Sequence, residues 1–426
     1  MWQPMAKAAP SDIAMRLVLA LVLSWLSCCS GSPAVPSILL KNAAVPGTFY
    51  PMTGLGLNGP GFEIPTTATQ PQCWKYPACC TESYCPAVNA TRDWLAMGGT
   101  RIDTGFPYGD SSPLWGPVLG PTCAGASSGD DVARRRLGHQ CDARGTRLGI
   151  EQSGVARDDL FITVKSGFAG PMMAIDEPYV PWIGKGQADW ELAWLGLDYA
   201  DLYLAHEGDL GNTGMEPASI CAYPTTAACR LVVWRSCLGW MAKNRTRACG
   251  VANWELAWLE ELVDANVTLP AVLQTKFHLH QSLASPRIRA LKDFCDARGI
   301  LFTGYSPLGR ADWTRFNASV GTPTLLEEPL VRSIAARVGR SPAEVLLRWH
   351  AKLGVATQPR STDPAHMAEN LAVFGAWAAA DLTDDDVAAL SALPQCSEIR
   401  GDPFVEGDPE DEDHEYRNMI GPTKTC

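Results

Sequence analysis

Short apolar segments alternate with segments of helical spacing along the C-terminal half of the chain, and this alternation constrains the fold most strongly. Arg247–Val251, Ala271–Phe277 and Ile300–Tyr305 have the length and apolar content of buried strands. Glu255–Asp264 and Ser285–Arg298 separate them and carry apolar residues at helical spacing. Strands that are joined through helices pair in parallel, so this pattern predicts an α/β fold with a parallel sheet.

The same alternation extends toward the N-terminus with interruptions, and it gives eight predicted strands. They are Met52–Leu57, Thr100–Thr104, Leu160–Lys165, Asp201–His206, Arg247–Val251, Ala271–Phe277, Ile300–Tyr305 and Val355–Gln358. Eight parallel strands with intervening helices close into a (β/α)8 TIM barrel, which is the fold we predict. A short hairpin over residues 37–50 is expected to precede the barrel.

The predicted barrel occupies residues 37–400 and is interrupted by two insertions. One covers about residues 59–86 and is rich in proline, threonine and cysteine; the other covers about residues 111–141 and is rich in glycine and serine. We expect disulfides to staple the first insertion. Zinc is the alternative, but paired Cys-x-x-Cys spacing and a nearby histidine are missing there, so no metal site is predicted. Residues 401–426 form an acidic tail.

Residues 1–34 have the order of a secretory signal peptide. Lys7 and Arg16 precede an apolar run over 17–26, and small residues follow it. The run is short for a stable membrane span, and a retained signal anchor is the alternative. The sequence therefore predicts a secreted or lumenal protein.

Cysteines and glycosylation acceptors agree with that compartment. The chain has 15 cysteines, an unusually high number for a protein kept in a reducing cytosol. Four asparagines, Asn89, Asn244, Asn266 and Asn317, stand in the Asn-x-Ser/Thr acceptor pattern. The alternative is a cytosolic enzyme with incidental cysteines. The net charge of −11, without a long basic run, argues against a nucleic-acid partner.

Four residues able to carry chemistry stand at or just after predicted strand ends. Asp103 and Tyr108 follow the second strand, Lys165 ends the third, and His206 ends the fourth. In a parallel barrel these ends share one face, and barrel enzymes have their active sites on that face. Each residue alone also has a structural interpretation, such as a turn cap or a solvated cation. Their order and shared context favour a catalytic site.

This order resembles the aldo-keto reductase family, in which Asp and Tyr stand five apart after the second strand, followed by Lys and then His. The segments LGLDYADLYLAH (195–206) and GYSPLG (304–309) resemble family segments as well. The resemblance implies an NADP(H)-dependent reductase of small carbonyl compounds. Tyr108 would then donate the proton, Lys165 would make the phenol more acidic, Asp103 would hold Lys165, and His206 would orient the carbonyl.

The resemblance also implies the residues that hold the cofactor. Asn253 and Gln274 match residues that bind the nicotinamide carboxamide, and Tyr305 matches the aromatic residue that stacks on the nicotinamide ring. Matches to the two phosphate-binding segments are Ser306, Leu308, Arg360, Ser361, His366, Glu369 and Asn370. Because Arg360 offers a permanently charged fork, we expect NADPH to bind more tightly than NADH.

Several positions depart from the family pattern. Arg360 stands where lysine is usual and His366 where arginine is usual, Glu207-Gly208 replaces a common Trp-Pro, and Gly167 lies where an aromatic residue is frequent. The predicted substrate pocket is therefore unlike that of well-known members. The alternative function is a non-catalytic glycoprotein that keeps the barrel as a binding or interaction module. The sequence specifies neither the substrate nor the oligomeric state.

Overall fold

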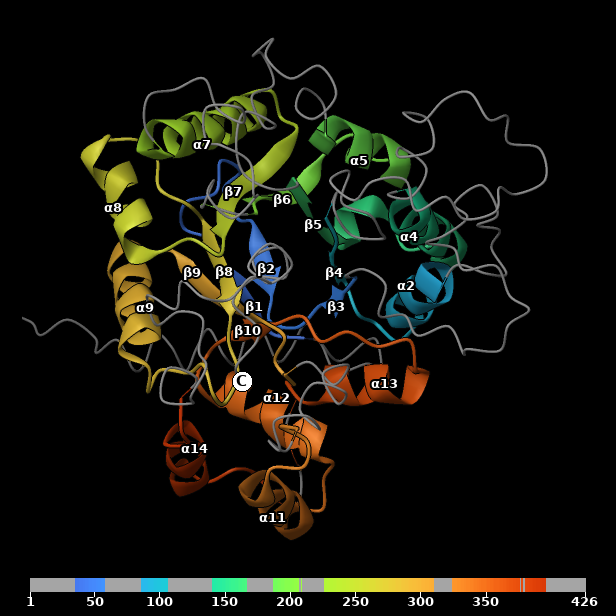
Figure 1. Cartoon of the computed structure of the whole chain (residues 1–426). Coiled ribbons are helices and arrows are strands. Elements are labelled where there is room, and N and C mark those ends of the chain that lie inside the picture. Colours follow the sequence, from blue (N-terminus) through green and yellow to red (C-terminus); the bar gives the residue numbers. More distant parts are fainter. Residues whose placement is uncertain are drawn as a thin grey trace, which may run out of the picture. The chain divides into compact units, whose positions relative to one another are not determined.

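A computed structural model describes residues 35–57, 86–105, 140–166, 187–206, 208, 226–309, 324–375, 377 and 380–395. The predicted leader, nearly all of both insertions, Tyr108, Asn317 and the acidic tail lie outside these residues. Within them, the strands form a central parallel sheet and the helices lie around it (Figure 1).

The eight predicted strands are confirmed, in sequential order and all parallel. They are β3 (Leu55–Gly56), β4 (Arg101–Asp103), β5 (Phe161–Ser166), β6 (Ala200–Ala205), β7 (Thr246–Ala252), β8 (Val272–Lys276), β9 (Leu301–Tyr305) and β10 (Ala356–Thr357). Main-chain hydrogen bonds also join the two outer strands: Gly54 donates to Thr357 at 3.0 Å and Thr357 donates to Met52 at 2.9 Å. The sheet therefore closes on itself as a (β/α)8 barrel.

Helices follow the strands and cover the outside of the sheet. They are α2 (Pro86–Ala96), α4 (Gln140–Ser153), α5 (Gln187–Leu195), α7 (Thr226–Ala242), α8 (Leu256–Asp264), α9 (Pro286–Arg298), α11 (Pro329–Val338), α12 (Pro342–Lys352), α13 (Pro364–Ala372) and α14 (Asp384–Ser391). A short 3-10 turn, η3 (Arg157–Asp159), leads into β5. Helices α13 and α14 were not predicted from the sequence, although Asp363 and Thr383 cap their N-termini in the usual way.

Two apolar cores hold the barrel together. The larger core lies between sheet and helices and includes Trp94, Ile162, Leu192 and Trp349. The smaller core fills the barrel interior with Phe161, Leu202, Val272 and their neighbours. Alternate residues along each strand serve one core or the other, as the pleat of a strand requires.

The predicted hairpin is confirmed as β1 (Ser37–Leu39) and β2 (Phe49–Pro51), with Leu39 opposite Phe49. Its buried Tyr50 packs edge-on against Phe161, with ring centroids 5.0 Å apart, and belongs to the interior core. Arg101 of β4 donates a hydrogen bond to the Tyr50 hydroxyl. The hairpin thus plugs the barrel interior below the strand ends that carry the candidate site.

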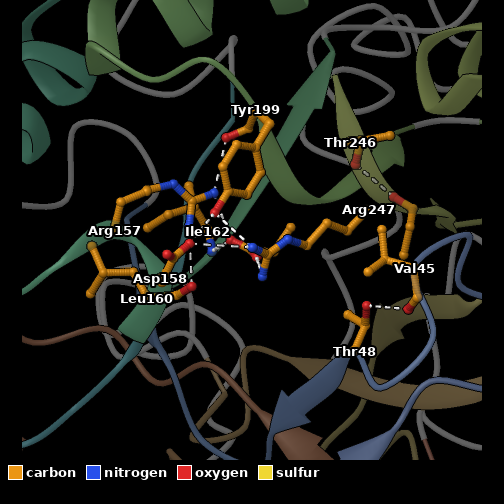
Figure 2. Close-up of polar contacts among 11 residues, drawn as sticks. Val45, Thr48, Arg157, Asp158, Leu160, Ile162, Tyr199, Thr246 and Arg247 are labelled. Carbon is orange, nitrogen blue, oxygen red and sulfur yellow. Dashed lines mark hydrogen bonds and ion pairs between the residues drawn. The ribbon is translucent and has the colours of Figure 1, made fainter. Parts of the chain in front are cut away.

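An ion-pair network ties the N-terminal ends of β5, β6 and β7 together (Figure 2). Asp201 is buried, and its carboxylate pairs with Arg157 at 2.8 Å and with Arg247 at 3.1 Å. The Tyr199 ring lies near both guanidinium groups, with its centroid 3.9 Å from Arg157 Cζ and 4.7 Å from Arg247 Cζ. The network joins three strands and the turn before β5.

One disulfide is defined within the described residues, between Cys237 of α7 and Cys249 of β7. Cys229 is also disulfide-bonded, and Cys295 is a buried free thiol whose pKa burial raises to about 12. The expected staples of the first insertion lie outside the described residues. The Cys237–Cys249 bridge was not predicted, because two isolated cysteines in a helix and a strand give no pairing signal.

Candidate active site

Asp103 and Lys165 meet at the C-terminal ends of two neighbouring strands. The parallel register places Asp103 beside Thr163, two residues before Lys165. Both side chains are buried, and the Lys165 ammonium donates a hydrogen bond to Asp103 Oδ1. The same ammonium donates to the main-chain oxygen of Thr104 at 3.1 Å. A buried cation is stable only with such partners, so the pair fixes the position of Lys165.

Gln274 of β8 reaches the same carboxylate from another strand of the barrel. Its Nε2 donates to Asp103 Oδ2 at 2.9 Å, so each Asp103 oxygen accepts a hydrogen bond from a different side chain. The two residues are 171 positions apart in the sequence. A cofactor role for Gln274 was predicted from the sequence, but this contact was not. The contact also orients the Gln274 amide at the C-terminal end of the barrel.

His206 directly follows β6, the strand next to β5. Burial, followed by the charge of Lys165, lowers the pKa of its imidazole from 6.5 to about 3. The Nδ1 atom of the ring is buried, and the residue as a whole is half-buried. A neutral imidazole suits the predicted task of hydrogen bonding to a carbonyl oxygen.

Asn253 connects the end of β6, where His206 lies, with Gln274 of β8. Its Nδ2 donates to the main-chain oxygen of His206 at 3.2 Å, and its main-chain N–H donates to Gln274 at 2.9 Å. The residue has a left-handed backbone, with φ of 59°, which asparagine tolerates better than most residues. The structure therefore brings Asp103, Lys165, Gln274, Asn253 and His206 to one end of the barrel.

Gly208 explains one departure from the family pattern. A Cβ atom at this position would lie 2.4 Å from the Trp258 ring and 3.1 Å from Trp254. Arg230 donates a hydrogen bond to the Gly208 carbonyl at 3.3 Å. The ring of Trp258 thus takes up space that a larger residue after the histidine would need.

The predicted nucleotide-binding residues lie after β9 and β10. Tyr305, Ser306 and Leu308 are half-buried at the end of β9, and Ser306 has a positive φ of 52°. Arg360 and His366 are exposed, and the Ser361 hydroxyl accepts a hydrogen bond from the Asp363 N–H at 3.0 Å, just before α13. A guanidinium, a hydroxyl and an imidazole beside a helix N-terminus form a donor set that fits a phosphate.

The last two predicted cofactor residues have structural contacts. Glu369 accepts a hydrogen bond from the Ser341 hydroxyl at 3.2 Å, and Asn370 is buried on the inner side of α13. Both belong to α13, the helix that begins at the predicted phosphate-binding segment. Their roles toward a nucleotide stay predictions.

One ionisable residue near the pair was missed by sequence reasoning. Glu191 of α5 is 1% exposed. Burial raises the pKa of its carboxyl from 4.5 to about 8; Lys165 opposes this rise most strongly, and Asp103 adds to it. The only sequence signal was an acid in an otherwise apolar helical segment, WELAWL (190–195), which a solvated position would explain equally well.

The buried acid–lysine pair lies at the strand ends where barrel enzymes have their active sites, and comparisons identify the family. The sequence model of the aldo/keto reductase family matches residues 87–394. An uncharacterised oxidoreductase of Bacillus subtilis is 30% identical over 318 residues, which is 74% of this chain and 86% of that protein. The chain therefore belongs to the aldo-keto reductase family.

Two further comparisons agree with this assignment. Human aldo-keto reductase family 1 member A1 is 34% identical over 226 residues, or 52% of this chain and 64% of that enzyme; the chain spans just under two thirds of it. The crystal structure of an aldo-keto reductase complexed with NADPH superposes with a TM-score of 0.58 at 22% identity, covering 85% of this chain and 89% of that one. Members of the family are generally NAD(P)H-dependent carbonyl reductases.

Proposed function

We propose that this protein is an NADP(H)-dependent reductase that converts an aldehyde or ketone to an alcohol. The observation that carries this proposal is the buried Asp103–Lys165 pair, held from a third strand by Gln274. Maintaining a buried lysine and carboxylate at a strand end is costly for a protein that needs only a stable barrel. The cost is understandable where the ammonium has a chemical task.

The nicotinamide cofactor would supply a hydride to the carbonyl carbon, and the chain would supply the proton and the orientation. An unperturbed phenol has a pKa of about 10, so it is a weak acid at neutral pH. The Lys165 ammonium, placed by Asp103 and Thr104, would stabilise the phenolate of Tyr108 and ease release of its proton. The neutral imidazole of His206 would donate to the same carbonyl oxygen and orient it.

We infer that NADPH is the preferred cofactor. Arg360 is exposed in the segment before α13, where a forked cation suits a 2′-phosphate. Ser361 and His366 would add hydrogen bonds at the same helix end. Gln274 and Asn253 would bind the carboxamide of the nicotinamide from the strand ends.

We place the protein in the secretory pathway. All three acceptor asparagines within the described residues, Asn89, Asn244 and Asn266, have exposed side chains. The Cys237–Cys249 disulfide is typical of an oxidising compartment. No helix in the described part of the chain is long and apolar enough to cross a membrane. Glycosidase treatment of the natural protein should increase its gel mobility, and an unglycosylated natural protein with free thiols would contradict this assignment.

The catalytic assignment is tested with purified protein, NADPH and a panel of aldehydes and ketones. We expect turnover by the wild type and a loss of roughly 10²-fold or more in Tyr108→Phe, with nearly unchanged NADPH binding followed by tryptophan quenching. NADPH binding without turnover by the wild type would instead support the non-catalytic binding module. Full activity of Tyr108→Phe would remove Tyr108 from the mechanism.

A further inference from the structure

Glu191 occupies a position where a barrel helix normally has an apolar residue. It shares the inward face of α5 with Ala188, Leu192 and Leu195, all of which are buried. Helices that pack on a sheet present apolar residues on this face. Burying a carboxyl group there costs free energy of desolvation, so its presence calls for a specific role.

The charged groups that face this carboxyl are those of the candidate active site. Lys165 of β5 and Asp103 of β4 are the charged side chains that act on it. On the neighbouring helix α4, Arg147 and Glu151 are exposed and pair with each other at 2.7 Å. Glu191 is therefore electrically coupled to the acid–lysine pair and not to a surface ion pair.

Thr104 provides a structural link between Glu191 and Lys165. Its main-chain oxygen accepts the Lys165 ammonium at 3.1 Å, and its side chain faces the Glu191 carboxyl. Neither carboxyl oxygen makes a hydrogen bond of normal geometry with the part of the chain that the structure describes. The Thr104 side chain and the Lys165 main chain still lower the pKa of this carboxyl, but burial raises it more strongly. Such a carboxyl is stable when it holds a proton and costly when it is ionised.

We propose that Glu191 is a positioning residue of the active site, that its carboxyl holds a proton while the site works, and that loss of this proton weakens the action of Lys165. The proton leaves to solvent, and no other bond changes. The catalytic consequence rests on the proposed reductase function, but the electrostatic coupling does not.

The charge of the site explains the expected effect. With Glu191 protonated, the charges of Lys165 and Asp103 cancel. With Glu191 ionised, a second carboxylate lies beside one ammonium, and the three groups carry one net negative charge. A phenolate at Tyr108 is then less stable, and proton donation to the carbonyl becomes slower. Binding of the adenosine end of NADPH is remote from this change and should stay the same.

The electrostatic coupling between Glu191 and Lys165 is tested first by a titration that needs no catalytic turnover. The full-length protein is labelled with ¹³Cε-lysine, and the Lys165 resonance is assigned by its loss in Lys165→Met. We expect this resonance to shift with a midpoint near pH 8 in the wild type, and to lose that step in Glu191→Gln. The same step in both proteins, or no step in either, would overturn the proposal.

Two further variants keep the result interpretable. Glu344 is another buried glutamate, but its carboxylate accepts from the Ser341 N–H at 2.8 Å and caps α12. Glu344→Gln should leave the Lys165 titration unchanged. Glu191→Asp should keep a titration step at a shifted midpoint. If Glu191→Gln fails to fold, Glu191→Leu removes the same charge with an apolar side chain suited to the helix face.

Steady-state kinetics then separate this proposal from the proposed function. We expect the wild-type kcat to fall about tenfold as pH rises through the Glu191 titration and the Glu191→Gln profile to stay flat, with equal KM for NADPH. A lysine titration without any turnover would reject the reductase function and keep the coupling. Turnover with the same pH profile in both proteins would reject the positioning role alone.

Discussion

The two ends of the barrel use buried charge differently. At the N-terminal end, both Asp201 oxygens pair with arginines, and the carboxylate also accepts from the Ile162 N–H at 2.9 Å (Figure 2). At the C-terminal end, Asp103 has partners on both oxygens, but Glu191 is buried near it without a hydrogen bond of normal geometry to the described residues. The first arrangement holds strands together. The second retains a costly ionisable group beside a lysine, as active sites do.

The largest expected difference between the two ends of the barrel is in how stability depends on pH. Glu191 at the C-terminal end should make the free energy of unfolding depend on pH. Its pKa is about 8 in the folded state and near 4.5 when unfolded, so folding favours the protonated form. Its stabilising effect is fully present below about pH 4.5 and is lost as pH rises toward 8. The difference between the two pKa values corresponds to at most about 5 kcal/mol in the free energy of unfolding.

Urea unfolding of the wild type and Glu191→Gln across this pH range measures that contribution. The variant should become more stable relative to the wild type as pH rises, with a constant difference above about pH 8. A difference that does not change with pH would show that Glu191 is not a buried proton-holding acid. The contrast between a paired carboxylate at the N-terminal end and a protonated carboxyl at the C-terminal end would then not hold.

Removing the central acid of the N-terminal network should have the next largest effect. Asp201→Ala removes the buried carboxylate with which Arg157 and Arg247 both pair. We expect a loss of about 3 kcal/mol in the free energy of unfolding. Measured by urea unfolding, the loss should come without a change in kcat per folded molecule. A large fall in kcat at unchanged stability would mean that this end also serves the reaction.

A substitution at Gly208 tests the packing just after β6 and His206. In Gly208→Ala the new Cβ would meet the Trp258 ring at 2.4 Å, so the ring or the backbone must shift. We expect a cost of about 1–3 kcal/mol and a changed KM for the carbonyl substrate. In the matched control Gly239→Ala on α7, the new Cβ has free space among the described residues, and stability should rise by roughly 0.5–1 kcal/mol. Equal melting temperatures for the two variants would contradict this account of the packing of Gly208 against Trp258.

The smallest expected effect concerns the choice of nucleotide. Arg360→Ala should weaken NADPH binding about tenfold, or about 1.4 kcal/mol, and leave NADH binding nearly unchanged, because only NADPH carries the 2′-phosphate. Tryptophan quenching gives both dissociation constants. Arg289, an exposed arginine of α9, provides the control, and Arg289→Ala should change neither constant. Equal weakening of both nucleotides would remove Arg360 from the phosphate site.

Much of the fold was predictable because most barrel strands are short segments rich in apolar residues that alternate with helical segments. The acid at the end of β4 and the lysine of β5 were predictable as well, since their order resembles a family pattern. The Gln274–Asp103 contact was not, because it joins residues 171 positions apart across the barrel. Glu191 was missed because a helical acid looks the same in sequence whether it faces water or the sheet. Helix α14 was missed, although its Thr383–Asp386 capping box marks its start.

The central claim is that Lys165 at the C-terminal end of the barrel acts in carbonyl reduction, and single-turnover kinetics test it most directly. With NADPH bound and a carbonyl compound in excess, Lys165→Met should oxidise NADPH roughly 10²-fold or more slowly than the wild type, while binding NADPH with a similar dissociation constant. Lys292→Met, which removes a surface partner of Asp296, should match the wild type. An unchanged rate in Lys165→Met, measured on protein that binds NADPH normally, would contradict the account.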